Sequence, residues 1–262
     1  MNRNLQIQEL KALYQQFSKH SHYQILASSL SEIIGNNNLC VNSRYERERL
    51  EYIISILDPR GKKILDIGGN TGFFTFEILK LGAESVTYYE GNQEHFRFVD
   101  KARELLGCEN KVVIYNEYLS FQNDLVDKKY NIILLLNVLH HIGDDYGDKK
   151  LSIENAKESI VSSINSLASV CEYLVLQLGF CWQGDRNKLL FKHGTKREMI
   201  DFLSKEIGYK WDFVGIGIPE RKENVVKYVE IDDLNIRRND SLGEFLNRPM
   251  FILESKENTQ IS

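Results

Sequence analysis

The sequence contains few prolines, 3 in 262 residues, and only 4 cysteines, which are scattered along the chain. No two of them form a Cys-x-x-Cys pair, so they predict neither a zinc site nor a redox pair, and we expect reduced, buried thiols at Cys40, Cys108, Cys171 and Cys181. The chain also lacks the ~18-residue apolar run that crosses a bilayer, and its first residues lack the apolar stretch of a signal peptide. We therefore expect a cytoplasmic protein without membrane contact.

An excess of positive charge is missing as well. The chain has 33 basic and 37 acidic side chains, which give a formal net charge of −4. Proteins that bind a nucleic-acid backbone usually concentrate basic side chains on one surface. The balance argues against DNA and disfavours RNA as a partner. We expect a small-molecule substrate and a monomer or homodimer.

Helical periodicity dominates the first 57 residues. Apolar side chains recur at helical spacing in two groups, which are Leu10, Leu13, Tyr14 and Phe17, and then Leu26, Leu30, Ile33 and Ile34. Ser43, followed three residues later by Glu46, indicates a capping box that opens a further helix. Pro59-Arg60-Gly61 then ends the helical region. We expect an N-terminal helical cap over residues 1–58 and a Rossmann-like domain over residues 59–262.

From Lys62 onward, strand and helix patterns alternate. The expected strands are 63–67, 85–89, 111–115, 130–137, 173–178, 211–216 and 250–254, and the expected helices between them are 72–81, 93–106, 153–169 and 195–206. Strands separated by helices predict an α/β fold with a doubly wound, seven-stranded and mostly parallel sheet. A polar stretch at 219–248 predicts a long insertion in a terminal antiparallel hairpin. Its Arg237-Arg238 pair stands among acidic residues and does not indicate a nucleic-acid patch.

A glycine-rich turn follows the first expected strand. It reads Ile64-Leu65-Asp66-Ile67-Gly68-Gly69-Asn70-Thr71-Gly72, and Glu90 closes the next strand about 20 residues after Gly68. An acid at that distance can bind the hydroxyl pair of a ribose. Nicotinamide-dependent enzymes also combine a glycine-rich turn with an acid that binds the ribose. Their turn has the spacing Gly-x-Gly-x-x-Gly, which this turn does not have. Asp66, two residues before the first glycine, suits a cationic amino-acid ligand better than a pyrophosphate. A plain structural turn remains the alternative.

These residues resemble motif I and the acidic end of the second strand in class I S-adenosylmethionine-dependent methyltransferases, and the resemblance extends over roughly residues 60–254. It implies S-adenosylmethionine as the cofactor and S-adenosylhomocysteine as the product. It also implies that Asp66, Gly68 and Gly72 shape the methionine pocket, that Glu90 binds the ribose and that Asn137 lies near the methionine part. The segment 116–118 is expected beside adenine, although many relatives have an aspartate there. The complete predicted cofactor set is Asp66, Gly68, Gly69, Asn70, Gly72, Glu90, Gly91, Asn116, Glu117 and Asn137.

Two histidines follow the fourth expected strand, where ligands of parallel sheets bind. His140 or His141 could accept a proton from a hydroxyl acceptor, because histidine titrates near neutral pH. The alternative is that the first histidine only packs or orients the loop. Adjacent side chains usually point in different directions, so we expect one base at most. With Asp144 and Asp145 the pair has the residue types of a metal site, but the mixed charges after it indicate a surface loop, and we predict no metal.

The segment after the fifth expected strand mixes aromatic and basic residues. Such a segment suits an anionic acceptor, such as a phosphate, a phosphosugar or a sugar nucleotide, and a solvated lid is the alternative. The N-terminal helices could close over the site and add further residues. The predicted substrate-binding set is Tyr23, Arg44, Tyr45, Gln177, Trp182, Arg186, Lys192 and His193.

The glycine turn and the histidine pair are also loosely similar to a branch of methyltransferases acting on phosphates and glycans, and to tRNA wobble-uridine enzymes. The prediction is O-methylation of a phosphorylated or sugar-derived metabolite in surface-glycan (capsule or O-antigen) polysaccharide biosynthesis or secondary metabolism. Three alternatives stay open. They are a tRNA- or RNA-modifying methyltransferase, a nicotinamide-dependent oxidoreductase and a non-catalytic partner of an active methyltransferase subunit.

Overall fold

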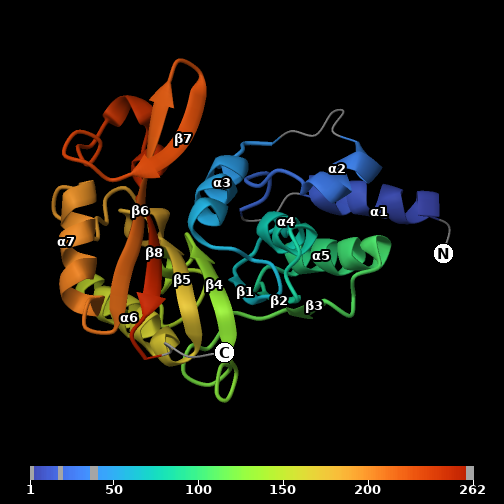
Figure 1. Cartoon of the computed structure of the whole chain (residues 1–262), viewed down its shortest axis with the longest axis horizontal. Helices are drawn as coiled ribbons and strands as arrows, with labels where there is room; N and C mark the ends of the chain where they lie inside the picture. The colour runs from blue at the N-terminus through green and yellow to red at the C-terminus, as the bar shows by residue number, and fades with distance from the viewer. Residues whose placement is uncertain (1–2, 17–19, 36–40, 258–262) are drawn as a thin grey trace. The chain divides into compact units, whose positions relative to one another are not determined.

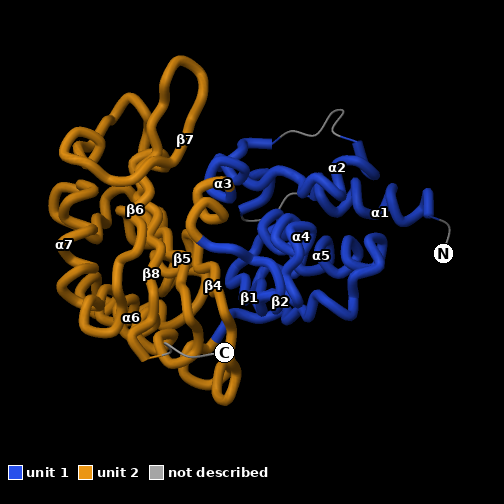
Figure 2. Tube along the Cα trace, in the orientation of Figure 1, with its two compact units in different colours: residues 1–50, 57–119 blue, residues 51–56, 120–262 orange. Residues whose placement is uncertain are grey.

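The computed structural model describes residues 3–16, 20–35 and 41–257 (Figure 1). Contacts divide the chain into two compact units, which Figure 2 shows in different colours. The first unit comprises residues 1–50 and 57–119, and the second comprises residues 51–56 and 120–262. Phe17, which belongs to the predicted apolar face of the first helix, and Cys40, a predicted buried thiol, lie outside the described residues.

The first unit contains three parallel strands in the order β3-β2-β1. The strands are β1 (Lys63–Ile67), β2 (Ser85–Tyr89) and β3 (Val112–Tyr115), and the helices between them are α4 (Phe73–Lys80) and α5 (Gln93–Leu106). The predicted bounds of β1, β2 and α5 are confirmed. The alternation of strand and helix puts both the glycine turn and Glu90 at the carboxyl ends of neighbouring strands, because β1 and β2 run parallel.

Helices α1 (Arg3–Gln15) and α2 (Ser28–Ile34) share a core with α4 and α5. Leu10, Leu30 and Phe98 are completely buried in it, and the rings of Tyr14 and Phe98 lie 5.5 Å apart. The apolar periodicity of the N-terminal region therefore buries one face of each helix within the first unit.

Helix α3 (Glu46–Ile56) begins later than the predicted capping box implied. The Ser43 hydroxyl donates to the Glu46 carboxylate over 2.7 Å. In a capping box it would instead accept the backbone N–H of Glu46. Tyr45 has a positive φ of 59°, so the chain reverses there and the helix starts at Glu46. The predicted pair of Ser43 and Glu46 is present. The predicted start of the helix was wrong, because this pair closes a turn in front of the helix.

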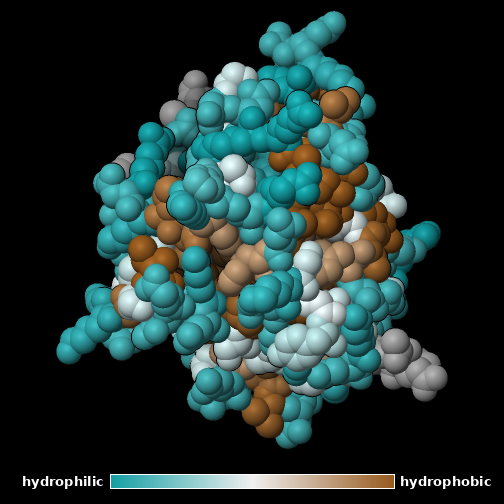
Figure 3. Space-filling view, turned by 90° about the vertical axis from the view of Figure 1, so that its left-hand side faces the viewer, coloured by the Kyte–Doolittle hydropathy of each residue, from teal (hydrophilic) through white to brown (hydrophobic). Residues whose placement is uncertain are grey.

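The second unit contains five strands in the order β4-β5-β8-β6-β7. They are β4 (Tyr130–Leu136), β5 (Cys171–Gln177), β6 (Trp211–Lys222), β7 (Val225–Glu230) and β8 (Met250–Ser255), with α6 (Ile153–Ser166) and α7 (Lys196–Ile207). Only β4 and β5 pair in parallel; the other pairs are antiparallel. Figure 3 shows the face that carries α7, where hydrophilic side chains surround scattered apolar ones.

The described residues thus form the predicted α/β fold with mostly parallel strands, but they number eight where we predicted seven. The pairs β5–β8, β6–β8 and β6–β7 are antiparallel. The additional strand lies inside the predicted insertion at 219–248. Strand β6 continues through Pro219 to Lys222 and forms a hairpin with β7. A proline is tolerated there because β6 pairs with β7 alone from Ile218 onward, next to the outermost strand.

The cysteines of the described part are free, and Cys171 and Cys181 are buried as expected, whereas Cys108 is only partly buried. Among the described residues, no helix combines the length and the apolar character that crossing a bilayer requires.

Candidate functional site

The glycine turn of the first unit connects β1 to α4. Gly68, Asn70 and Gly72 have positive φ angles of 68°, 52° and 76°, so the chain bends sharply at three of five successive residues. Gly72 is the residue before the first turn of α4. The backbone N–H groups of the turn donate within the protein, those of Gly68 and Gly69 to the Tyr89 carbonyl and that of Gly72 to the Gly69 carbonyl.

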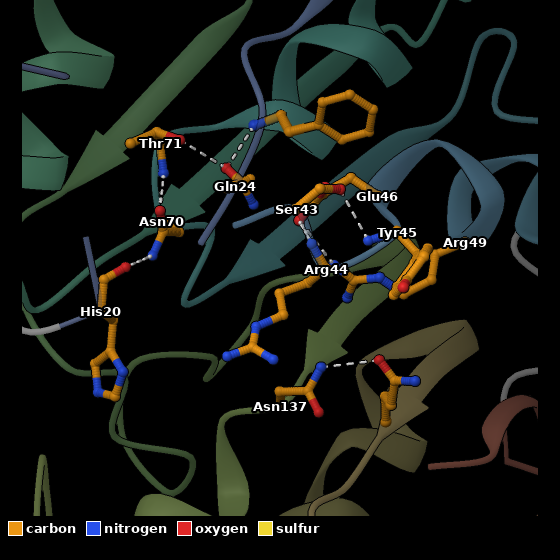
Figure 4. A network of polar contacts seen from close by, with 12 residues as sticks. His20, Gln24, Ser43, Arg44, Tyr45, Glu46, Arg49, Asn70, Thr71 and Asn137 are labelled. Atoms are coloured by element: carbon orange, nitrogen blue, oxygen red, sulfur yellow. Dashed lines mark hydrogen bonds and ion pairs between the residues drawn. The ribbon is translucent and has the colours of Figure 1, made fainter. Parts of the chain in front are cut away.

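Asn70 holds this turn in place, and Figure 4 shows its contacts. The Asn70 backbone N–H donates to Glu90 Oε2 over 2.9 Å, and its side-chain Nδ2 donates to the His20 carbonyl over 3.1 Å. Its Oδ1 accepts the Thr71 N–H, and its carbonyl accepts the Tyr88 hydroxyl. An asparagine tolerates the left-handed conformation better than most residues, and here its side chain is fully used to keep it.

Glu90 is a buried carboxylate, 8% exposed, at the end of β2. Its Oε2 accepts the Asn70 N–H, and its Oε1 accepts the Asn92 N–H over 2.8 Å. Burial raises the pKa of Glu90 to about 7, against the opposing effect of these two backbone N–H donors. A carboxylate offers about four acceptor positions, so two remain after the two N–H groups. These two acceptor positions fit a ribose, whose two adjacent hydroxyls can donate to one carboxylate.

Asp66, at the carboxyl end of β1, is a second buried acid of the first unit and is 3% exposed. Its Oδ2 accepts the hydroxyl proton of Thr75 over 2.7 Å. Burial raises the pKa of Asp66 to about 6, while Thr75 and the charge of Arg49 oppose the rise. Asp66 thus joins β1 to the first turn of α4.

The N-terminal segment supplies a contact that the sequence did not reveal. Gln24 is buried, and its Oε1 accepts the Thr71 hydroxyl over 3.1 Å and the Phe73 N–H over 2.9 Å (Figure 4). The Gln24 carbonyl in turn accepts the Tyr14 hydroxyl over 2.6 Å. Gln24 therefore caps the N-terminus of α4 from a distant part of the chain.

The predicted adenine segment meets the end of β2. Asn116 Nδ2 donates to the Glu90 carbonyl over 3.0 Å. Tyr118 lies flat against Gly91, where any β-carbon would come within 2.3 Å of its ring. Glu117 is exposed between them. The predicted cofactor residues up to Glu117 are thus gathered in the first unit, and Tyr118 offers an aromatic ring beside them.

Three predicted substrate residues also belong to the first unit. Tyr23 is 39% exposed, and the Arg44 guanidinium lies 4.7 Å from the centre of its ring. Tyr45 is partly buried at the start of α3. Arg44 and Tyr23 therefore form one cationic and aromatic pair.

Asn137 lies in the second unit, directly after β4, with a positive φ of 64°. Its Nδ2 donates to Gln177 Oε1 and its Oδ1 accepts Arg248 Nη1, both over 2.8 Å; Figure 4 shows the first of these bonds. Gln177 is completely buried and also donates to the Tyr228 hydroxyl. Gln177 thus supports Asn137 from within the protein, and its role in substrate binding stays a prediction.

His140 is 2% exposed, and its Nδ1 accepts the Gly179 N–H over 3.2 Å. This bond requires an unprotonated Nδ1, so the proton of the neutral ring sits on Nε2. Its ring lies 4.3 Å from that of His141, so the adjacent side chains do not diverge as we expected. His140 fits the loop-orienting alternative.

His141 is more accessible, with 18% of its side chain exposed. Its Nδ1 lies 3.5 Å from Asp145 Oδ2 and 4.0 Å from Asp144 Oδ2. A carboxylate beside Nδ1 favours the tautomer with a proton there, which leaves Nε2 to accept another proton. This is the arrangement of a general base with an orienting acid.

The segment after β5 divides into buried and exposed residues. Trp182 is 5% exposed and donates its indole N–H to the Ile142 carbonyl over 2.6 Å, so it braces the histidine loop. Arg186, Lys192 and His193 are exposed, and the His193 N–H donates to the carboxylate of Glu198. Of the predicted substrate residues in this segment, the exposed three are placed for contact with a solute.

Sequence reasoning missed Gln24, Arg49 and Arg248. Arg49 is 4% exposed beside Glu46 and faces the Phe74 ring at 5.0 Å. Each of the three acts through a contact with a residue far along the chain. Neither periodicity nor a local motif marks such a side chain.

No protein-family model and no curated protein sequence matches this chain. Several solved structures do. The bifunctional kinase-methyltransferase WbdD matches over 94% of this chain and 46% of its own length, with 15% identity and a TM-score of 0.58. A complex of WbdD with a kinase inhibitor gives a TM-score of 0.59. The chain therefore spans about half the length of WbdD.

Two looser matches are proteins provisionally described as methyltransferases. One, from Pyrococcus horikoshii and described as acting on RNA, matches over 99% of both chains with 14% identity and a TM-score of 0.48. The other, from Streptococcus pneumoniae and described as a tRNA (m1A22) methyltransferase, matches over 82% of this chain and 72% of its own, with 14% identity and a TM-score of 0.46. The likeness to WbdD shows a methyltransferase-like α/β fold.

Proposed function

We propose that the protein is an S-adenosylmethionine-dependent O-methyltransferase. Its acceptor would be a small polar molecule, a phosphorylated or sugar-derived metabolite in surface-glycan or secondary metabolism. The observation that carries the proposal is the position of Glu90. It is a buried carboxylate at the end of β2, joined by a hydrogen bond to the glycine turn and left with acceptor capacity for a ribose. A strongly raised pKa at such a position is typical of a functional site.

The residues of the first unit would bind the cofactor. Glu90 would accept both ribose hydroxyls, the turn at 68–72 would surround the methionine part, and Tyr118 would contact the adenine ring. When bound, S-adenosylmethionine supplies an electrophilic methyl group with a good leaving group. The protein then mainly has to align the acceptor and remove its proton.

In the second unit, His141 would accept the proton of the acceptor hydroxyl at Nε2. Asp145, 3.5 Å from Nδ1, would stabilise the imidazolium that forms. His140 would keep the loop in place through its bond to Gly179. Arg186, Lys192 and His193 would attract an acceptor of negative charge.

The contacts of Gln24 favour a methyltransferase over a nicotinamide-dependent oxidoreductase. Enzymes that bind dinucleotides place the pyrophosphate on the free N–H groups at a helix N-terminus. Here the Phe73 N–H already donates to the neutral Gln24 amide. The N-terminus of α4 is therefore capped from within the protein.

The test is isothermal titration of the whole chain with S-adenosylhomocysteine and, separately, with NAD. We expect micromolar binding of the first and none of the second. Glu90→Gln should weaken binding about tenfold or more, because it removes the charged acceptor of two hydroxyls. Glu84→Gln is the matched control, since Glu84 is exposed before the opposite end of β2 and should leave the affinity unchanged.

Binding of NAD alone would overturn the proposal. Binding of neither ligand would favour a non-catalytic partner subunit. Equal affinities of the wild type and Glu90→Gln would mean that the ribose is held elsewhere.

A further inference from the structure

Two arginines from the C-terminal part of the chain, Arg238 and Arg248, lie at the segment Phe180–Cys181, which follows β5 in the second unit and continues to Arg186. The Arg238 guanidinium lies 5.5 Å from the centre of the Phe180 ring. Arg248 is paired with Glu244 over 2.5 Å, and Glu244 in turn accepts the Phe180 N–H over 3.3 Å. Burial and the charge of Glu244 raise the pKa of the Cys181 thiol, and Arg248, Arg238 and Arg186 all oppose that rise. Contacts therefore place Arg238 and Arg248 at Phe180, and Arg186 follows five residues after Cys181 in the same segment.

Two of these arginines retain hydrogen-bonding capacity. Arg238 donates from Nε to Asp240 over 2.6 Å and from Nη1 to the Gly194 carbonyl, and within the described chain its Nη2 donates to nothing. Arg186 forms neither a hydrogen bond nor an ion pair with any residue that the structure describes. Arg238 and Arg248 are each paired with one acid, Asp240 and Glu244 respectively, whereas Arg186 is paired with none of the described acids.

The fixed partners of Arg238 and Arg248 matter for recognition. Asp240 and Gly194 hold the Arg238 guanidinium from one side, while Glu244 and Asn137 hold that of Arg248. A guanidinium held in this way loses less conformational freedom when it binds an anion. The planar fork of an arginine also matches the oxygens of a phosphate group in a way that a lysine does not.

We propose that Arg186, Arg238 and Arg248 form a binding site for a phosphate group, and that this group belongs to the methyl acceptor. The second half of this inference rests on the proposed function; the phosphate site itself does not. Arg238 comes from the insertion at 219–248, so the insertion would select the acceptor. The nearby Asp232, Asp233 and Asp240 oppose a polyanion and favour one small phosphate.

The chain offers a matched control for this site. Arg237 precedes Arg238 and carries the same charge, but its side chain makes no hydrogen bond or ion pair in the described part of the chain. Its charge is also not among those that act on the Cys181 thiol. Arg237→Gln therefore removes an equal charge at the neighbouring position of the sequence.

The experiment is a titration of the full chain with inorganic pyrophosphate at constant ionic strength, followed by calorimetry and by intrinsic tryptophan fluorescence. Arg238→Gln and Arg186→Gln should each weaken pyrophosphate binding about tenfold, the effect of one charge-assisted hydrogen bond. Arg237→Gln should change it less than about twofold. Equal binding by the wild type and Arg238→Gln, or an equal loss in Arg237→Gln, would overturn the inference.

Titration of the same preparations with S-adenosylhomocysteine separates the two proposals and checks that each variant is folded. Pyrophosphate binding without S-adenosylhomocysteine binding would leave the phosphate site standing and remove the methyltransferase assignment. Binding of S-adenosylhomocysteine without binding of pyrophosphate would overturn the phosphate site and leave the methyltransferase proposal standing.

Discussion

Gly179 donates its backbone N–H to Nδ1 of His140, and the side chain that Gly179 lacks would occupy the space of the imidazole. A β-carbon at this glycine would lie 2.7 Å from His140 Cδ2. The buried histidine and the loop after β5 are therefore fitted to each other. This fit supports the alternative in which His140 orients the loop.

Gly179→Ala should destabilise the protein by about 1–3 kcal/mol, the usual cost of overpacking a buried contact. Urea denaturation measures the free energy of unfolding. The control is the same substitution in a His140→Ala background, where the clash is relieved and the added cost should fall below about 1 kcal/mol. An undiminished cost there would mean that Gly179 is needed for another reason.

His141→Ala should lower kcat by about 10²–10⁴-fold if His141 is the general base, with the affinity for S-adenosylhomocysteine unchanged. The rate of S-adenosylhomocysteine formation with an accepted substrate measures this. Asp145→Asn should lower kcat less and shift the acidic limb of the pH profile to lower pH, since the carboxylate that favours the protonated ring is gone. Near-normal turnover of His141→Ala would exclude this base.

Glu90 makes the stability depend on pH. Burial raises its pKa from 4.5 to about 7, so the folded protein holds this proton more tightly than the unfolded chain. The corresponding stabilisation is complete below about pH 4.5 and is lost as the pH rises through about 7. Asp66, with a pKa raised to about 6, acts in the same direction.

In Glu90→Gln this contribution is absent. The unfolding free energy of the variant, relative to the wild type, should therefore rise by about 1–3 kcal/mol between pH 4 and pH 8. Denaturation curves at both pH values measure the difference. A constant difference would show that Glu90 titrates normally in the folded protein.

Gln24→Ala should cost about 1–2 kcal/mol, because it leaves the Phe73 N–H and the Thr71 hydroxyl without their buried acceptor. Hydrogen exchange of the Phe73 amide should accelerate by the corresponding factor. Gln16→Ala, in an exposed position, is the control and should have little effect on either measurement. If both variants behave alike, the cap contributes little.

The local pattern predicted the first unit well. The strands at 63–67 and 85–89 match β1 and β2, because alternating apolar runs bounded by turn residues leave a local signal. The glycine turn and Glu90 could be placed for the same reason. Gln24 could not, since its contact with Thr71 depends on how the N-terminal helices pack.

The sequence predicted the strands at the end of the second unit less well. Pro219 and the polar residues after it read as an insertion, although they belong to the β6–β7 hairpin. An outer strand has solvent on one side, so its side chains need not be apolar, and its pattern resembles that of a loop. The arginine cluster around Cys181 joins residues from two separate segments, and only the fold brings them together.

The buried carboxyl of Glu90 also has a calorimetric consequence. Burial raises its pKa to about 7, so a fraction of the molecules holds a proton on this group at neutral pH. A ligand whose hydroxyls bind the ionised form releases that proton to the buffer. The heat of titration would then include the ionisation heat of the buffer, and it would differ between Tris and phosphate while the affinity stayed the same. The slope of measured heat against buffer ionisation enthalpy counts the protons released and so reports on Glu90 in the unmodified protein.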